Sequence, residues 1–131
     1  MEVFTTLNII IFSIVGIWVG FEVFQYFRRK KAGVGLSSEE FKKEMRKAQI
    51  IDLRERDDFL AGHILGARNI PYLTLKQRMN ELRKDQPIYL YDEKETLSLR
   101  ASLLLKKAEY TDIYRLKDGY DQWDGRIKRG N

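Results

Sequence analysis

The chain has 131 residues, of which 44% are hydrophobic and 33% charged, so it has room for one domain of about 100 residues and a short appendage. It has no cysteine, which excludes disulfides, thiolate nucleophiles and cysteine-bound metals. With His63 as its one histidine, the sequence predicts neither a metal site nor a cofactor. Its net charge of +5 is spread along the chain, whereas nucleic-acid binding usually has basic residues gathered on one face. No nucleic-acid partner is therefore predicted.

The N-terminal segment is apolar and carries no charge from Val3 to Phe21. Its length is close to the about 20 residues that span a bilayer, and it is apolar all the way round a helix. A cleaved signal peptide would carry its positive residues before the apolar run, and here they follow it. Residues 1–27 are therefore predicted to be a transmembrane helix, with residues 3–27 in contact with membrane lipid.

Four basic residues follow at once: Arg28, Arg29, Lys30 and Lys31. By the positive-inside rule, they predict a single-pass cell-membrane protein whose C-terminal part is cytoplasmic. The same charges could also attract anionic lipid. Residues 28–36 are predicted to be a flexible basic juxtamembrane tether, and residues 37–131 a folded domain.

The domain opens with the sequence Ser37-Ser38-Glu39-Glu40, which is a capping box. Leu36 and Phe41 are spaced as the accompanying hydrophobic staple, so a helix is predicted to begin here. The apolar pattern then changes to that of a buried strand over residues 49–53. A further helix is predicted over residues 74–82.

Later segments continue this alternation, with strands predicted over 88–91 and 112–116 and a helix between them over 98–108. Alternating strands and helices favour parallel pairing with right-handed crossovers. The fold class is therefore α/β, an open parallel sheet with helices on both faces. Ligands of such folds bind beyond the carboxyl ends of strands, where residues 92–97 lie.

Two stretches, residues 52–71 and 116–123, resemble the N-terminal and C-terminal signatures of rhodanese-like domains. Asp118 stands where the second signature has the first of two glycines. The resemblance implies a rhodanese-like fold. The matching residues are Asp52, Arg54, Gly62, His63, Gly66, Ala67, Asn69, Pro71, Gly119 and Trp123.

These signature residues have mostly structural roles by physical criteria. Asp52 and Arg54 are expected to satisfy loop amides and to pair with nearby charges. Gly62 and Gly66 are expected to allow tight turns. His63 is expected to fix a loop through hydrogen bonds, and the tryptophan of the second signature to pack in the core.

The loop after the strand at 88–91 departs from the family's active-site pattern. In active rhodaneses it holds a cysteine, then a glycine and an arginine, and a small residue at the helix start. Here it reads Asp92, Glu93, Lys94, Glu95, Thr96, Leu97 and Ser98. Asp92 stands at the cysteine position, Glu95 at the glycine and Leu97 at the arginine, while Ser98 keeps the pattern.

Sulfur transfer in this family passes through a cysteine persulfide, which a carboxylate cannot form. Related cell-cycle phosphatases need the same cysteine.

The predicted function is a membrane-anchored, catalytically inactive rhodanese-like module. This pseudoenzyme is predicted to be a binding or regulatory domain at the cytoplasmic face, for an unknown protein partner or a small ligand. One alternative is a sulfurtransferase or sulfur carrier that uses a partner's cysteine, and another is a structural tether. Asp92 could also be a phosphoryl-transfer nucleophile if Glu93 and Glu95 helped to hold Mg²⁺. The loop as a whole, residues 92–97, is predicted to form an acidic contact surface for a basic partner.

Overall fold

The computed structural model describes residues 2–31 and 33–131, without the side chains of residues 27–31. The side chains of the predicted basic flank, Arg28 to Lys31, therefore lie outside the described part. The chain divides into two compact units, one ending at Lys30 and the other running from Lys31 to Asn131. Each unit is considered by itself.

The N-terminal unit is one helix, α1 (Glu2–Lys31), as the apolar segment predicts. Over Glu2–Tyr26 it is long and apolar enough to cross a membrane, by length and composition. Its large apolar side chains are exposed, including Trp18 at 62%. The hydroxyl of Ser13 donates to the carbonyl of Ile9 at 2.8 Å, so this polar group is satisfied within the helix.

From Gly33 to Asn131, the described residues of the second unit form fourteen short elements, a mixture of strands and helices. Its strands are β1 (Val34–Leu36), β2 (Gln49–Asp52), β3 (His63–Ile64), β4 (Arg68–Asn69), β5 (Ile88–Tyr91), β6 (Ile113–Leu116) and β7 (Ile127–Lys128). Its α-helices are α2 (Ser38–Glu44), α3 (Arg56–Ala61), α4 (Tyr72–Arg78) and α5 (Thr96–Lys107). Its 3₁₀ helices are η1 (Met45–Lys47), η2 (Met79–Glu81) and η3 (Tyr120–Gln122).

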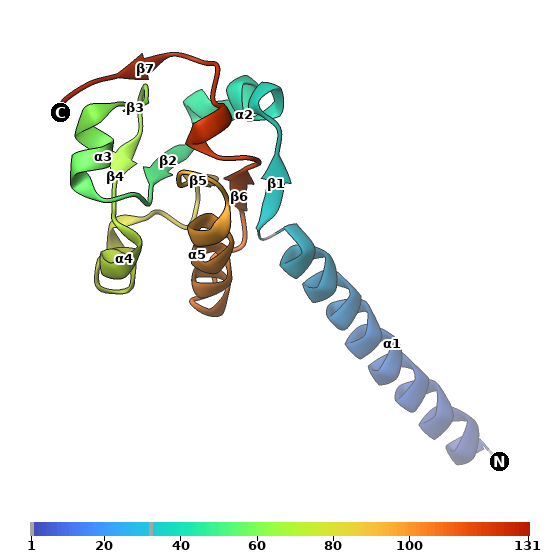
Figure 1. Ribbon diagram of the computed structural model, residues 1–131. Coiled ribbons are helices and arrows are strands. Elements are labelled where there is room, and N and C mark those ends of the chain that lie inside the picture. The colour runs from blue at the N-terminus through green and yellow to red at the C-terminus, as the bar shows by residue number, and fades with distance from the viewer. Residues whose placement is uncertain (1, 32) are drawn as a thin grey trace. The chain divides into compact units, whose positions relative to one another are not determined.

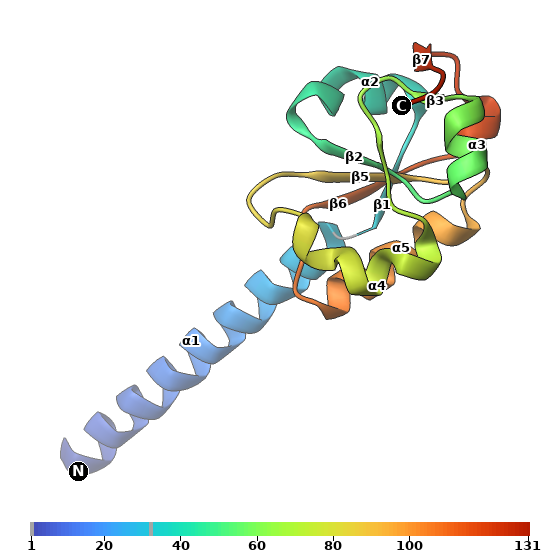
Figure 2. The same ribbon diagram turned by 90° about the vertical axis from the view of Figure 1, so that its left-hand side faces the viewer.

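Five strands form one parallel sheet in the order β1-β6-β5-β2-β4, and β3 and β7 form a small antiparallel pair. Helix α2 lies on one face of the large sheet, and α4 and α5 lie on the other (Figures 1 and 2). The predicted α/β class, with helices on both faces of a parallel sheet, is confirmed. The antiparallel pair was not predicted.

The central strand β5 explains why the sheet has a core on each face. All four of its residues are buried. Ile88 and Leu90 pack with Leu105 of α5 in one cluster, while Tyr89 and Tyr91 pack in a second cluster on the α2 side. Alternate side chains of a strand point to opposite faces, so an uninterrupted apolar run is what a doubly covered strand needs.

Helix α2 begins at the predicted capping box. The Glu40 amide donates to the Ser37 hydroxyl at 3.2 Å, and the Ser37 amide donates to the Glu40 carboxylate at 3.3 Å. The hydroxyl of Ser37 and its amide lower the pKa of Glu40. Leu36 packs against the cluster that contains Phe41, in agreement with the predicted staple.

The flexible tether predicted up to residue 36 is wrong for its last part. Val34 to Leu36 form the edge strand β1, in register with Tyr114 to Leu116 of β6. The amide of Gly33 donates to the carbonyl of Ile113 at 2.8 Å. The folded domain therefore begins at Gly33, two positions after the end of α1.

The helices differ in part from the prediction, and α5 begins at Thr96, two residues before its predicted start. Helix α4 begins at Tyr72, two residues before the predicted start, with Pro71 preceding it, and gives way to η2 at Met79. Helix α3 was not predicted, because it has only six residues and one buried side chain, Phe59. A helix this short has no apolar period to detect.

Candidate functional site

The loop between β5 and α5 is organised around the side chain of Asp92, which is only 4% exposed. One carboxylate oxygen accepts the Leu97 amide at 2.9 Å, and the other accepts the Ser98 amide at 3.3 Å. Both amides belong to the first turn of α5, where backbone N–H groups have no partner within the helix. The Asp92 carboxylate satisfies them, and its negative charge is favourable at this end of the helix dipole.

The predicted acidic contact surface loses Asp92 to this burial, whereas Glu93 stays 56% exposed. Asp92 is enclosed, and the carboxylate of Glu93 accepts from Arg54 at 3.2 Å. Of the three predicted acids, only Glu95 is free of an ion pair or capping bond within the described residues, and it is itself partly buried. The capping bonds also count against Asp92 as a phosphoryl-transfer nucleophile, since its carboxylate is enclosed and hydrogen-bonded to its own helix.

The backbone at Gly119 packs closely against the loop between β5 and α5. The amide of Tyr120 donates to the carbonyl of Asp92 at 2.9 Å, and the amide of Asp121 donates to that of Glu93 at 3.0 Å. Gly119 has φ +66°, and a Cβ there would collide with the carbonyl oxygens of residues 92–94. Asp118, at the position of the family's other glycine, is also left-handed with φ +63°.

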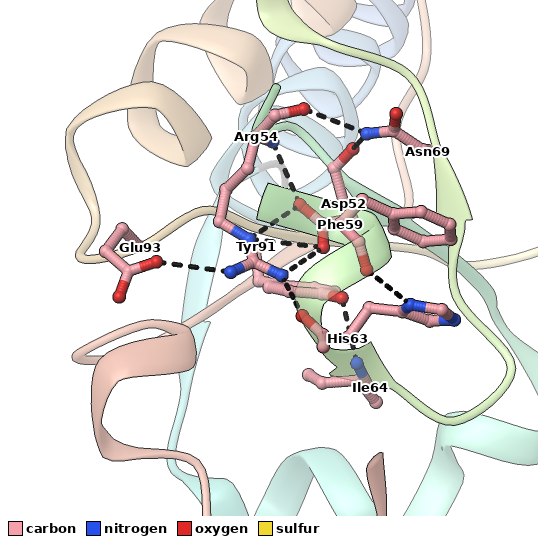
Figure 3. A network of polar contacts seen from close by, with 9 residues as sticks. Asp52, Arg54, Phe59, His63, Ile64, Asn69, Tyr91 and Glu93 are labelled. Atoms are coloured by element: carbon pink, nitrogen blue, oxygen red, sulfur yellow. Dashed lines mark hydrogen bonds and ion pairs between the residues drawn. The ribbon is translucent and has the colours of Figure 1, made fainter. Parts of the chain in front are cut away.

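A buried ion pair lies beneath the loop (Figure 3). Asp52 is fully buried and Arg54 is 7% exposed. The Arg54 guanidinium donates from Nη2 to Asp52 at 2.8 Å and to the Gly62 carbonyl at 2.6 Å, and from Nη1 to Glu93. Its centre lies 4.1 Å from that of the Tyr120 ring. The pairing predicted for Asp52 and Arg54 is thus present.

This arrangement fixes the charge of Arg54. Burial alone would lower its pKa, but the hydrogen bonds and negative charge of Asp52, with a further hydrogen bond to Glu93, raise the pKa of Arg54 above its ordinary value. The guanidinium therefore stays protonated, and two carboxylates and a carbonyl engage it. No local pattern in the sequence indicates its contact with Glu93, 39 residues away.

Other signature residues tie the surrounding loops together. The His63 ring is buried and stacked on Phe59, and its Nδ1 lies 2.7 Å from the Phe59 carbonyl oxygen, which gives the hydrogen bond predicted for His63. The side-chain amide of Asn69 donates to the backbone carbonyls of Asp52 and Arg54 at 3.1 and 2.8 Å. Figure 3 shows these side chains around the ion pair.

The two glycines of the first signature serve different purposes. Gly66 has φ +93°, as a tight left-handed turn requires. Gly62 has an extended backbone instead and ends α3, where its amide donates to the Phe59 carbonyl at 3.2 Å. A Cβ on Gly62 would come within 2.8 Å of the Tyr120 hydroxyl, and this close approach is what favours glycine. Ala67 and Trp123 pack against the cluster on the α2 side of the sheet.

Comparisons with known proteins agree with this architecture. Residues 37–126 match the family described as Rhodanese-like domain. The chain is 45% identical to YqhL of Bacillus subtilis over 121 residues, which is 92% of this chain and 96% of YqhL. The crystal structure of the Alr3790 protein from Anabaena sp. is similar, with 26% identity and a TM-score of 0.67 over 72% of this chain and 80% of that one.

Two further relatives have names that refer to sulfur. The putative sulfur carrier protein YrkF of Bacillus subtilis is 28% identical over 71% of this chain, and the match spans 52% of YrkF, about half of its length. The thiosulfate sulfurtransferase GlpE of Pseudomonas fluorescens is 25% identical over 58% of this chain and 70% of GlpE. The chain is thus related to sulfur carrier and sulfurtransferase proteins.

Proposed function

The chain belongs to the rhodanese-like domain family, and on that premise we propose that it is a catalytically inactive member, anchored in a membrane by α1. Its domain then binds or regulates a protein partner at the cytoplasmic face of that membrane. The observation that carries the proposal is the Asp92 carboxylate, which caps α5 at the position of the family's cysteine.

The chemistry of sulfur transfer explains why this carboxylate supports the proposal. A thiolate has to attack the sulfur donor and carry sulfane sulfur as a persulfide, and backbone N–H groups at the helix start stabilise the charge. Here the amides of Leu97 and Ser98 already bind the carboxylate of Asp92. An incoming thiosulfate would find these donors occupied by an anion that cannot leave, and Leu97 at the arginine position supplies no charge.

The purified chain is expected to show no thiosulfate sulfurtransferase activity above buffer, because it has no thiol to hold the sulfur. The variant Asp92→Cys should gain little, since Glu95 and Leu97 remain. The triple variant Asp92→Cys, Glu95→Gly, Leu97→Arg restores the family pattern and is the fair comparison. Production of thiocyanate from thiosulfate and cyanide measures all three. Turnover by the unaltered chain, reproduced after removal of contaminating enzymes, would refute the proposal.

The orientation of the anchor is part of the proposal. Arg28 to Lys31 follow the apolar segment, and no basic residue precedes it. A reporter that is active only in the cytoplasm should therefore give signal when fused after Asn131. The matched control replaces the four basic residues by glutamine and adds four lysines before Val3, which should reduce that signal. Signal confined to a reporter that requires export would contradict the proposed orientation.

The second candidate is a sulfur-carrier or sulfurtransferase component that works with a partner's cysteine, which the similarity to YrkF and GlpE favours. It predicts that the chain accelerates sulfur transfer by a cysteine-bearing partner without turnover of its own. Cross-linking in intact membranes would supply candidate partners. Each partner can then be assayed for sulfur transfer with the unaltered chain and with Asp92→Asn.

A further inference from the structure

A cleft on the α2 side of the domain lies apart from the loop just described. Its volume is about 760 Å³, which is within the range of sites for small molecules. It opens between α2, the turn after β3 and the segment that follows η3, and Figure 1 shows α2 beside η3. No residue of the loop 92–98 lines it.

The apolar part of the cleft is open to an occupant. Met45 and Ile50 line it from one side, and Leu65 is 43% exposed although it lies within the folded domain. Trp123 is partly buried, and its ring meets Phe41 edge-on at 5.6 Å, so the indole is held in place. A fixed indole beside the exposed Leu65 side chain favours a planar or branched apolar body.

The charged part of the cleft is positive. Lys42 is neutralised by Asp124, 2.7 Å away, and lies over the Trp123 ring at 5.5 Å. Arg46 and Arg126 also line the cleft, and neither has an ion-pair partner among the described residues. Two exposed arginines without carboxylate partners therefore line the same cleft as the apolar residues. Guanidinium groups bind carboxylates through paired hydrogen bonds.

We infer that this cleft binds a small organic acid, with an aromatic or branched aliphatic body beside Trp123 and its carboxylate at Arg46 and Arg126. Charge complementarity supports an acid over a neutral apolar ligand, because a carboxylate gains attraction and hydrogen bonds at the two exposed cations that a neutral ligand does not. The site does not depend on sulfur chemistry, so an experiment that refutes the acid site leaves the function proposed above unaffected, and the reverse also holds.

The test uses the full chain in nanodiscs of neutral lipid. The probe is 4-(trifluoromethyl)benzoate, and its binding is followed by ¹⁹F NMR. The chain has two tryptophans, so in a Trp18→Phe background Trp123 fluorescence reports on the cleft directly. Each of Arg46→Met and Arg126→Met should weaken binding about threefold, and the double variant on the order of tenfold. Arg100→Met, an exposed change on α5 outside the cleft, is the matched control and should leave binding unchanged.

Three results would overturn the inference. The first is equal binding of the neutral isostere 4-(trifluoromethyl)benzamide, which would reduce the cleft to an apolar groove. The second is an equal loss of binding in Arg100→Met, which would indicate general surface charge. The third is loss of benzoate binding when anionic lipid replaces neutral lipid in the nanodisc, which would assign Arg46 and Arg126 to the membrane surface.

Discussion

Replacing Arg54 by methionine is expected to lower the free energy of unfolding by about 3–5 kcal/mol. The methionine side chain keeps most of the packing against Tyr120 but removes the charge. Asp52, which is fully buried, would then hold its carboxylate without its ion-pair partner. Since the free energy of unfolding of such a domain is only about 5–15 kcal/mol, this loss should be a large part of its stability.

The measurement is urea unfolding of the full chain in neutral micelles, followed by Trp123 fluorescence in a Trp18→Phe background. Arg68→Met is the matched control, because Arg68 is 50% exposed and pairs with Glu81 at 2.9 Å. An exposed pair contributes about 0–1 kcal/mol. Adding Asp52→Asn to Arg54→Met should recover part of the loss, since it removes the uncompensated charge. Equal effects of the Arg54 and Arg68 changes would contradict this account of the ion pair.

Replacing Gly119 by alanine is expected to lower the free energy of unfolding by about 3 kcal/mol or more. Two causes act together at this position. The backbone angles, φ +66° and ψ −165°, belong to a region used almost only by glycine. The new methyl group would also collide with the carbonyl oxygens of residues 92–94, which would push the capping loop away from α5.

Gly130→Ala is the matched control for Gly119→Ala. Gly130 has φ +80°, but a Cβ there meets no atom within 4 Å. Its cost should be limited to the backbone conformation, about 1–2 kcal/mol. The same unfolding measurement applies to both variants. If the two losses were equal, the packing of Gly119 against the loop would not be what stabilises the loop.

Features that depend on neighbours in the sequence could be predicted from the sequence. The capping box of Ser37 and Glu40 involves residues three apart, and the structure has both of its hydrogen bonds. Strand β5 was predicted with its observed bounds, because four consecutive apolar residues before a polar loop are typical of a buried strand.

Features that depend on distant residues could not be predicted. Strand β1 has three residues, one of them a glycine, and it is a strand because β6 provides its partners. The capping by Asp92 also gave no local signal, because a usual N-cap side chain bonds an amide two or three residues ahead. Asp92 reaches amides five and six residues ahead, which depends on the closed form of the loop.

The edge strand β1 also has a consequence for the order in which the nascent chain can fold. The carbonyl of Gly33 accepts a hydrogen bond from Arg115, 82 residues further along the chain. Synthesis proceeds from the N-terminus, so α1 and β1 leave the ribosome long before β6 exists. Closing so long a loop has an entropic cost that only the finished sheet can offset. A ribosome stalled before residue 113 would therefore carry a complete α1 whose following strand still lacked its partner.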